Sequence, residues 1–230
     1  MNNQITILSI EGNIGSGKST VINTLKEYYK NNDKNNEKVY FLEEPVSEWV
    51  EIKDSDGKNI IEKFYENQEH YSFSFQMMAY ISRLAMLKRA IKHCKEKGIK
   101  LIICERSLQT DKNVFCKMLH DSGKIEDINF QIYNKWFSDF ITEIPLIYFV
   151  YIKTEPKIAY ERVLKRNRKG ENISVEYLEM CSMYHDNWLI ENCVNSNIKN
   201  ETRNCIVING NEVSSTTFEK TNEIVSSFIS

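Results

Sequence analysis

The chain has 230 residues, of which 41% are hydrophobic and 27% are charged, so it is long enough to bury a core as one α/β domain. Its 30 lysines and arginines nearly balance 32 aspartates and glutamates, and the net charge of −2 excludes a general attraction to nucleic acids or anionic membranes. No apolar run in the sequence approaches the ~20 residues that span a bilayer. We therefore expect no nucleic-acid partner and no membrane partner.

The cysteines and the N-terminal residues indicate the compartment. The six cysteines are scattered along the chain and form neither C-x-x-C pairs nor zinc-ligand patterns with histidine. The N-terminal residues show neither a signal-peptide pattern nor an Arg-rich presequence. We expect reduced thiols and a cytoplasmic protein.

The first predicted strand, Ile5–Ile10, runs into a glycine-rich loop and then into a helix-prone stretch over Val21–Lys30. The loop matches the full pattern G-x-x-x-x-G-K-S, which favours a phosphate site over a glycine-rich turn without a ligand. Its glycines let backbone N–H groups point at phosphate oxygens beside the positive end of the helix dipole. Lys18 would bridge the β- and γ-phosphates, and the Ser19 hydroxyl would ligate Mg²⁺. The predicted ATP-binding residues here are Gly12, Asn13, Ile14, Gly15, Ser16, Gly17, Lys18, Ser19 and Thr20.

Short β-branched runs alternate with helical stretches along the chain, which predicts βαβ units and a parallel sheet with helices on both faces. The predicted fold is an α/β P-loop fold with a five-stranded parallel sheet flanked by helices, as one domain over residues 1–230. Ligands should bind at the carboxyl ends of the strands. A long helix is predicted over Phe73–Lys97, with Gln76 and Arg83 on one face. The predicted strands are Ile5–Ile10, Val39–Leu42, Leu101–Cys104, Leu146–Ile152 and Cys205–Ile208.

Charged residues follow two of these strands. Glu44 lies after the second strand and before a proline, whose stiff backbone suits a general base that must meet a hydroxyl proton. Glu105 and Arg106 follow the third strand, where an acidic residue commonly completes the Mg²⁺ site of P-loop enzymes. Arg106 could then hold the transferring oxygen or orient Glu44. The alternatives are a solvated glutamate pair at the first place and a local ion pair at the second.

A basic segment lies on a predicted helix in the C-terminal half. Arg162 and Arg166 stand at i and i+4 on one face of that helix, and Arg168 lies at its end, near Gly170. Such a segment can close over bound ATP as a helical lid, here about residues 162–173, and place arginines near the developing charge. A solvated basic helix end, which the helix dipole favours, is the alternative.

The motifs described so far, together with several others, occur in a fixed order along the chain. In that order they are residues 11–20, Glu44-Pro45-Val46 with Trp49, Tyr65, Phe75-Gln76, Glu105-Arg106-Ser107, residues 162–171, and Tyr177-Leu178 leading to His185-Asp186-Asn187-Trp188-Leu189. Together they closely resemble the deoxyribonucleoside kinase family, which contains deoxycytidine, deoxyguanosine and mitochondrial thymidine kinases. The resemblance extends from Ile5 to about Val213. It implies phosphoryl transfer from ATP, with Mg²⁺, to the 5′-hydroxyl of a deoxyribonucleoside, in a homodimer formed through the long helices.

The resemblance implies a role for each charged residue at the strand ends. Glu44 resembles the general base that accepts the 5′-hydroxyl proton, and Arg106 resembles its partner at the 5′-oxygen. With Lys18 on the phosphates, these are the implied catalytic residues. Ser19 and Glu105 resemble the Mg²⁺ site. The implied ATP-binding arginines of the lid are Arg162, Arg166 and Arg168.

The resemblance also implies a nucleoside site. Tyr65 and Glu171 resemble the pair that hydrogen-bonds the sugar 3′-hydroxyl, which would couple substrate binding to lid closure. Gln76 resembles the amide that pairs with the base edge. Phe75 and Phe115 would hold the base by stacking or edge contact, with ordinary core packing as the alternative. The complete implied substrate site is Glu44, Trp49, Tyr65, Phe75, Gln76, Arg83, Arg106, Asp111, Phe115 and Glu171.

Two charged positions bear on base choice. Arg83 lies two helical turns after Gln76, so both side chains should project into one pocket, and Asp111 follows on the segment after the third strand. Family members for deoxycytidine and purine deoxynucleosides resemble this chain in carrying Arg and Asp here, whereas thymidine-preferring members have apolar residues. The resemblance therefore implies that deoxycytidine or purine deoxynucleosides are preferred over thymidine. Residues 209–212, expected near the adenine of ATP, match the family loosely.

The nearest alternative is a nucleoside monophosphate kinase of the thymidylate kinase type, which shares the P-loop and a lid. Such an enzyme must bind a 5′-phosphate, so an Asp-Arg-Tyr motif and additional basic pocket residues are expected. The motifs at Glu44 and Glu105-Arg106-Ser107 indicate a neutral hydroxyl acceptor instead. A GTPase switch is disfavoured because Asn134-Lys135-Trp136-Phe137 lacks the aspartate of a guanine-reading N-K-x-D motif.

Overall fold

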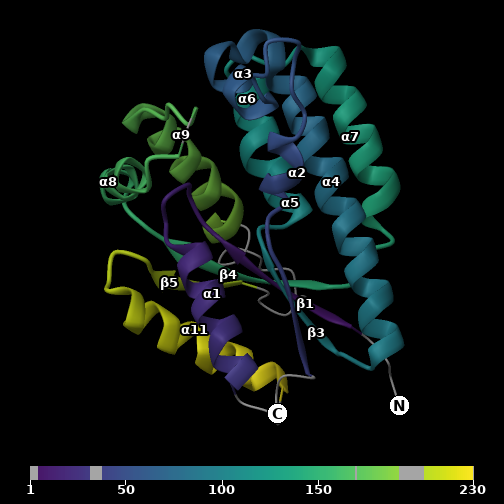
Figure 1. The fold of residues 1–230 in the computed structure, drawn as a ribbon, viewed down its shortest axis with the longest axis vertical. Coiled ribbons are helices and arrows are strands. Elements are labelled where there is room, and N and C mark those ends of the chain that lie inside the picture. Colours follow the sequence, from purple (N-terminus) through teal and green to yellow (C-terminus); the bar gives the residue numbers. More distant parts are fainter. Residues whose placement is uncertain (1–4, 32–37, 169, 192–204, 230) are drawn as a thin grey trace.

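The computed structural model of the protein describes residues 5–31, 38–168, 170–191 and 205–229 (Figure 1). At its centre is an all-parallel sheet with the strand order β2-β3-β1-β4-β5. The predicted α/β fold with a five-stranded parallel sheet is thus confirmed, and every predicted strand forms within one residue of its predicted ends. The strands are β1 (Thr6–Glu11), β2 (Val39–Leu42), β3 (Leu101–Glu105), β4 (Ile147–Lys153) and β5 (Cys205–Asn209).

Helices cover both faces of the sheet. In Figure 1, α1 and α11 lie together on one side of the sheet, and α4 and α7 run beside each other on the other side. The helices of the described residues are α1 (Lys18–Asn31), α2 (Val46–Val50), α3 (Ile60–Glu66), α4 (Gln68–Lys97), α5 (Leu108–Thr110), α6 (Lys117–Asp121), α7 (Asp127–Ile141), α8 (Pro156–Arg166), α9 (Val175–Asp186) and α11 (Ser214–Ile229), with two π-helical segments, η1 (Asp111–Cys116) and η2 (Asn187–Glu191).

The sheet has a hydrophobic core on each face because successive strand residues point to opposite sides. Ile7 of β1 packs in the cluster that contains Tyr80 of α4. The next residue, Leu8, packs in the cluster with Leu25 of α1 and Val225 of α11. With both faces covered, the carboxyl ends of the strands are left for a ligand.

The longest helix, α4, begins at Gln68, earlier than the predicted start at Phe73. The side chain of Asn67 accepts a hydrogen bond from a backbone N–H of the first turn and caps the helix there. The first turn is polar and lacks the apolar spacing on which the prediction depended. The helix ends at Lys97 as predicted, where Gly98 takes the left-handed conformation with a φ of 72°.

The cysteines of the described residues include four buried thiols, Cys94, Cys104, Cys116 and Cys181. Burial raises the pKa of the Cys104 thiol to about 12. Cys193 and Lys169, the latter within the predicted lid, lie outside the described residues. None of the helices in the described part of the chain combines the length and the apolar character needed to cross a membrane.

Candidate active site

The glycine-rich loop connects β1 to α1 and packs closely against two neighbouring segments. Gly15 has a φ of 77°, and a Cβ atom there would overlap the carbonyl oxygen of Ala159 in α8. A Cβ atom at Gly12 would lie 2.6 Å from the carbonyl oxygen of Ile152 in β4. Glycine is therefore required at both positions, and β4 and α8 hold the loop in shape.

Lys18 is buried and folded onto the loop. Its Nζ donates to the carbonyl oxygen of Asn13 at 2.6 Å and to Ser16 Oγ at 3.4 Å. Burial lowers the pKa of Lys18 to about 7, and the charge of Arg106 contributes to this. A bound triphosphate would supply the negative charge that favours the protonated lysine.

Gly12 and Asn13 differ from the other predicted ATP-binding residues because they do not line the cavity described below. The buried amide of Asn13 donates from Nδ2 to the carbonyl oxygen of Leu178 in α9 at 2.8 Å. Its Oδ1 accepts a hydrogen bond from the backbone N–H of Ile14 at 2.8 Å. These two residues shape the loop instead of facing a ligand.

The loop opens into a cavity of about 760 Å³ that extends to α3, α4 and η1. This volume falls in the range of small-molecule sites. The predicted site residues that line it are Ile14, Gly15, Ser16, Gly17, Lys18, Ser19, Thr20, Glu44, Trp49, Tyr65, Phe75, Gln76, Arg83, Glu105, Arg106, Asp111, Phe115, Arg162, Arg166, Arg168 and Glu171.

The cavity is also lined by residues that were not predicted for the site from the sequence. Ala79 lies between Gln76 and Arg83 at helical spacing, a signal from which it could have been found. Val46 and Tyr177 belong to the ordered motifs but had no predicted role in the site. The other additional wall residues gave no such signal, and they include Ile61, Phe64, Val213, Ser214 and Thr217.

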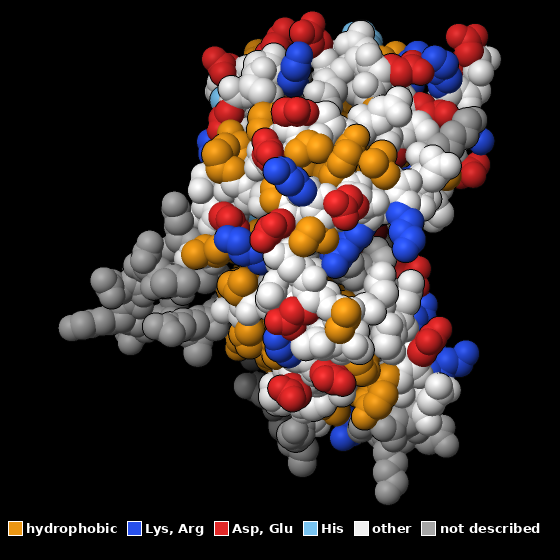
Figure 2. Space-filling model, turned by 90° about the vertical axis from the view of Figure 1, so that its left-hand side faces the viewer, with side chains coloured by type: hydrophobic (Ala, Val, Ile, Leu, Met, Phe, Trp, Pro, Cys, Tyr) orange, Lys and Arg blue, Asp and Glu red, His pale blue; other side chains and the backbone are white. Residues whose placement is uncertain are grey.

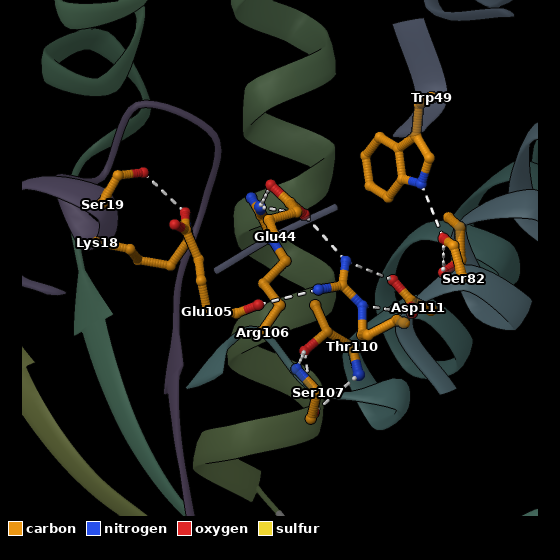
Figure 3. A network of polar contacts seen from close by, with 12 residues as sticks. Lys18, Ser19, Glu44, Trp49, Ser82, Glu105, Arg106, Ser107, Thr110 and Asp111 are labelled. Atoms are coloured by element: carbon orange, nitrogen blue, oxygen red, sulfur yellow. Dashed lines mark hydrogen bonds and ion pairs between the residues drawn. The ribbon is translucent and has the colours of Figure 1, made fainter. Parts of the chain in front are cut away.

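Glu44 lies in a network of charged side chains between the two ends of the cavity (Figure 3). It follows β2, whereas Arg106 follows β3 and Arg83 lies on α4. Glu44 Oε1 accepts hydrogen bonds from Arg83 Nη2 at 2.9 Å and from Arg106 Nη1 at 3.1 Å. Burial raises the pKa of Glu44, but Arg106 and Arg83 outweigh burial and lower this pKa to about 2. The carboxylate is therefore ionised and held from two sides.

Arg83 also pairs with Asp111, the first residue of η1. Arg83 Nε donates to Asp111 Oδ2 at 2.9 Å, and Arg83 Nη1 donates to the backbone carbonyl oxygen of Glu105 at 2.9 Å. Burial raises the pKa of Asp111, and the charge of Arg83 opposes this rise. Arg83 and Asp111, the two positions that bear on base choice, thus form an ion pair, and Arg83 also contacts Glu44, which the sequence did not predict.

Arg106 reaches Glu44 through an unusual backbone conformation. Its φ of 62° is left-handed, which is uncommon for a residue with a side chain and is found where the surrounding structure enforces it. The Arg106 N–H donates to the carbonyl oxygen of Ile10 at 3.1 Å and so holds the turn after β3 against β1. This turn leaves the side chain buried beside Glu44 (Figure 3).

The predicted metal ligands lie together. Ser19 Oγ, in the first turn of α1, donates to Glu105 Oε1, at the end of β3, over 2.8 Å (Figure 3). Within the described ranges, no three side chains of His, Cys, Asp or Glu gather in a group that could hold a metal ion. One hydroxyl and one carboxylate fit Mg²⁺, which usually keeps several waters and binds through few carboxylates and the substrate phosphates.

The end of the cavity at α4 combines a buried amide with aromatic rings. Gln76 is buried, and its Oε1 has no hydrogen-bond partner among the residues that the structure describes. The Phe75 ring lies 4.7 Å from the Phe64 ring and 5.5 Å from the Trp49 ring, between centroids. Phe75 is therefore both a core residue and a wall of the cavity. An amide oxygen without a partner, beside aromatic faces, suits a flat polar ring.

The predicted lid begins in α8 and lies against the phosphate loop. Arg162 donates from Nη1 to the carbonyl oxygen of Ser16 at 3.1 Å and from Nη2 to that of Gly210 at 3.0 Å. Arg166 Nη2 instead donates to Glu171 Oε2 at 2.6 Å. Arg162 thus ties α8 to the loop, whereas Arg166 holds a carboxylate within the lid.

Glu171 connects the lid to the part of the cavity that contains Tyr65. Its side chain is buried and also pairs with Arg168 Nη1 at 3.8 Å. Burial raises the pKa of the Tyr65 hydroxyl, and the charge of Glu171 contributes to this rise. The predicted partners Tyr65 and Glu171 are therefore close enough to interact electrostatically across the cavity that both of them line.

A family model for deoxynucleoside kinases matches residues 8–230 of the chain. The chain belongs to the deoxynucleoside kinase family. A probable deoxycytidine kinase of fowlpox virus (strain NVSL) is 36% identical to it over 189 residues, which cover 80% of this chain and 72% of the relative. Deoxycytidine kinase 2 of Gallus gallus is 32% identical over 211 residues, covering 84% of this chain and 77% of the relative. Mitochondrial thymidine kinase 2 of Homo sapiens is 30% identical over 189 residues, covering 81% and 65%.

Membership of the deoxynucleoside kinase family confirms the resemblance read from the ordered motifs. The alternative of a nucleoside monophosphate kinase of the thymidylate kinase type is not favoured by these relatives. The five-stranded parallel sheet and the phosphate loop are consistent with the fold of a P-loop deoxynucleoside kinase.

Proposed function

We propose that the protein transfers the γ-phosphoryl group of ATP to the 5′-hydroxyl of a deoxyribonucleoside and prefers deoxycytidine and purine deoxynucleosides over thymidine. The observation that carries the proposal is a single cavity lined by the phosphate loop, by Glu44 and by the buried Gln76. The relatives that are named deoxycytidine kinases support this acceptor class.

On the acceptor side, Glu44 suits a proton acceptor because it is ionised and faces the cavity. Arg106, which binds it at 3.1 Å, would hold the 5′-oxygen as the proton leaves. A carboxylate with a low pKa is a weak base. This suits a loose transition state, in which the attacking oxygen keeps its proton until late in the transfer.

On the donor side, the backbone N–H groups of the loop and the Lys18 ammonium would bind the triphosphate. Ser19 and Glu105 would hold Mg²⁺, which neutralises charge on the β- and γ-phosphates. Arg162 keeps α8 beside the loop, and Arg166 would stabilise charge on the transferring group. Residues 210–212 line the cavity and would approach the adenine.

The nucleoside would be recognised at three points. Tyr65 and Glu171 would hydrogen-bond the 3′-hydroxyl, and Gln76 would pair with the base edge. The pair of Arg83 and Asp111 would hydrogen-bond an amino-bearing base and crowd the 5-methyl group of thymine. The rings expected to hold the base are Trp49, Phe75 and Phe115.

We also propose that the protein is a cytoplasmic homodimer. Exposed apolar side chains follow one another at i, i+4 and i+8 on α7, namely Ile128, Ile132 and Trp136, and Ile81 is exposed on α4. By contrast, the face in Figure 2, on the side of α8 and α9, carries hydrophobic side chains mixed with charged ones. Buried, unpaired thiols such as Cys94 favour a reducing compartment.

The proposed activity is tested by a steady-state comparison of the four deoxynucleosides as acceptors, with ATP and Mg²⁺. We expect phosphorylation of deoxycytidine, deoxyadenosine and deoxyguanosine with higher kcat/KM than of thymidine, and loss of all activity with a chelator. A preference for thymidine over the other three would refute the base choice alone. Phosphorylation of thymidylate in place of any nucleoside would refute the proposed acceptor.

The base choice has a direct test in the variant Arg83→Met with Asp111→Ala, which removes both charges and strands neither in the core. The ratio of kcat/KM for thymidine to that for deoxycytidine should rise, because the crowding of the 5-methyl group is relieved. An unchanged ratio in a folded variant would show that this pair does not determine base choice.

A further inference from the structure

Arg83 is bonded through all three of its guanidinium nitrogens. Its Nε binds Asp111 at 2.9 Å, its Nη1 binds the backbone carbonyl oxygen of Glu105 at 2.9 Å, and its Nη2 binds Glu44 at 2.9 Å. The side chain is 6% exposed, so these bonds are shielded from water. One buried guanidinium therefore connects Asp111, the residue expected to contact the base, with Glu44, the residue expected to accept the proton.

Glu44 is held by two arginines that come from different elements. Arg106 stands on the turn after β3, and Arg83 stands on α4, and both donate to Oε1 of the same carboxylate. Lys18 of the phosphate loop adds a third positive charge nearby. Since Oε1 is shared, loss of either arginine would let the carboxylate turn toward the other.

Resting on the proposed function, we propose that Arg83 is a positioning residue for Glu44, so that base choice acts on kcat as well as on KM. Asp111 and Glu44 share this guanidinium. A base that hydrogen-bonds Asp111 compensates part of the negative charge of Asp111. Arg83 then stays bonded to Glu44 and holds it in position to accept the proton. A base that displaces the pair moves the proton acceptor as well, and a small displacement of a reacting group is costly for the rate.

A double-mutant cycle tests this coupling. The changes are Glu44→Gln, the paired replacement Arg83→Met with Asp111→Ala, and all three together, with kcat measured at saturating deoxycytidine and ATP. If Arg83 acts through Glu44, the paired replacement lowers kcat by up to about 100-fold in the unmodified protein and has little further effect once Glu44 is glutamine. If the fold-decreases in kcat from Glu44→Gln and from the paired replacement multiply in the combined variant, the two sites act independently and the inference is overturned.

The matched control is Gln76→Leu, two turns away on the same face of α4, because the buried Oε1 of Gln76 has no hydrogen-bond partner among the described residues. It should raise the KM for deoxycytidine more than it lowers kcat, and its effect should multiply with that of Glu44→Gln. A cycle for Gln76 that is as non-additive as the cycle for Arg83 would also overturn the inference, because the coupling would then be a general property of the pocket.

A second variant covers the case in which the paired replacement does not fold. Arg83→Lys keeps the positive charge beside Asp111 but lacks the planar fork that binds two carboxylates. It should lower kcat more than it changes the equilibrium affinity for deoxycytidine, measured without ATP by fluorescence quenching. An unchanged kcat would overturn the inference. Binding of deoxycytidine without phosphoryl transfer by the unmodified protein would refute the proposed function itself, and this inference with it.

Discussion

At the scale of single residues, Glu44 shows how a partly buried carboxylate can stay ionised. Burial raises its pKa, and Arg106 and Arg83 lower it by more, so that the pKa falls to about 2. The carboxylate keeps its charge throughout the neutral range. Its contribution to the rate should therefore depend on charge and position, and little on pH near neutrality.

The substitution Glu44→Gln keeps the shape of this side chain and removes the proposed proton acceptor. We expect kcat to fall by about 10²–10⁴-fold, with a much smaller change in the affinity for the nucleoside. The control is Glu43→Gln, because Glu43 is exposed and paired with Lys26 outside the cavity. Steady-state kinetics on both variants make the comparison, and near-normal kcat for Glu44→Gln would exclude it as the proton acceptor.

His185 makes the stability of the fold sensitive to acid. It is fully buried, stacks on Tyr151, and its Nδ1 donates to the carbonyl oxygen of Cys181 at 2.7 Å. Burial lowers the pKa of His185 from 6.5 to about 3. Between these values the unfolded chain binds a proton that the folded protein does not, so the free energy of unfolding falls as the pH falls below 6.5.

We therefore expect His185→Phe to flatten this acid dependence, which amounts to at most about 1.4 kcal/mol per pH unit for one group. Urea denaturation at several pH values between about 5 and 7 measures the slope. His93→Phe is the control, since it removes a histidine that is exposed on α4. A slope that is the same in the unmodified protein and His185→Phe would contradict the account.

At the scale of elements, α8 and the phosphate loop form one unit. Arg162 bonds to carbonyl oxygens of the loop and of residue Gly210, and Gly15 packs on the backbone of α8. Arg166 bonds instead to Glu171 of the lid. The different partners of Arg162 and Arg166 indicate that these two arginines have different roles.

The substitution Arg166→Ala should lower kcat more than it raises the KM for the nucleoside, because the charge of Arg166 is most useful as the phosphoryl group moves. Lys165→Ala is the matched control, an exposed neighbour that does not line the cavity. The kinetic constants for both substrates decide the matter. Raised KM values for both donor and acceptor at unchanged kcat would indicate a general electrostatic effect instead.

At the scale of the whole molecule, the strand order brings the charged strand ends together. β1 pairs with β3, so the loop after β1 lies beside Glu105, and Ser19 meets this carboxylate. β2 pairs with β3 on its other side, so Glu44 lies beside Arg106. The site is thus a property of the sheet edge as a unit.

The proposed homodimer is tested by Ile132→Glu, which places a charge in the apolar stripe of α7. A charge in an apolar interface without a partner is costly, so the dimer should dissociate to a 27.1 kDa monomer in sedimentation experiments. Met183→Glu is the control, because Met183 is equally apolar and exposed but lies on α9. An unmodified protein that sediments as a monomer would refute the homodimer.

Several features of this protein could be predicted from local patterns in the sequence. The phosphate loop is recognisable because its glycines and Lys18 are adjacent in the chain. The strands are recognisable because their β-branched runs are short and bounded by polar segments. The shared face of Gln76 and Arg83 follows from helical periodicity alone. The start of α4 does not follow from such a pattern, because a polar cap at Asn67 begins the helix without an apolar signal.

Which charges share a partner depends on the packing of distant elements and cannot be predicted from local patterns. The bond between Arg83 and Glu44 depends on how α4 packs beside the end of β2, and no local pattern records that distance. The anchoring of Arg162 on loop carbonyl oxygens likewise depends on the contact between α8 and the loop. Spacing along the chain places a side chain on a face of its own element. The partner of that side chain across the cavity depends on how elements distant in sequence pack together. A buried charge is costly without an opposite charge, and this packing determines which opposite charge lies close enough to pair with it.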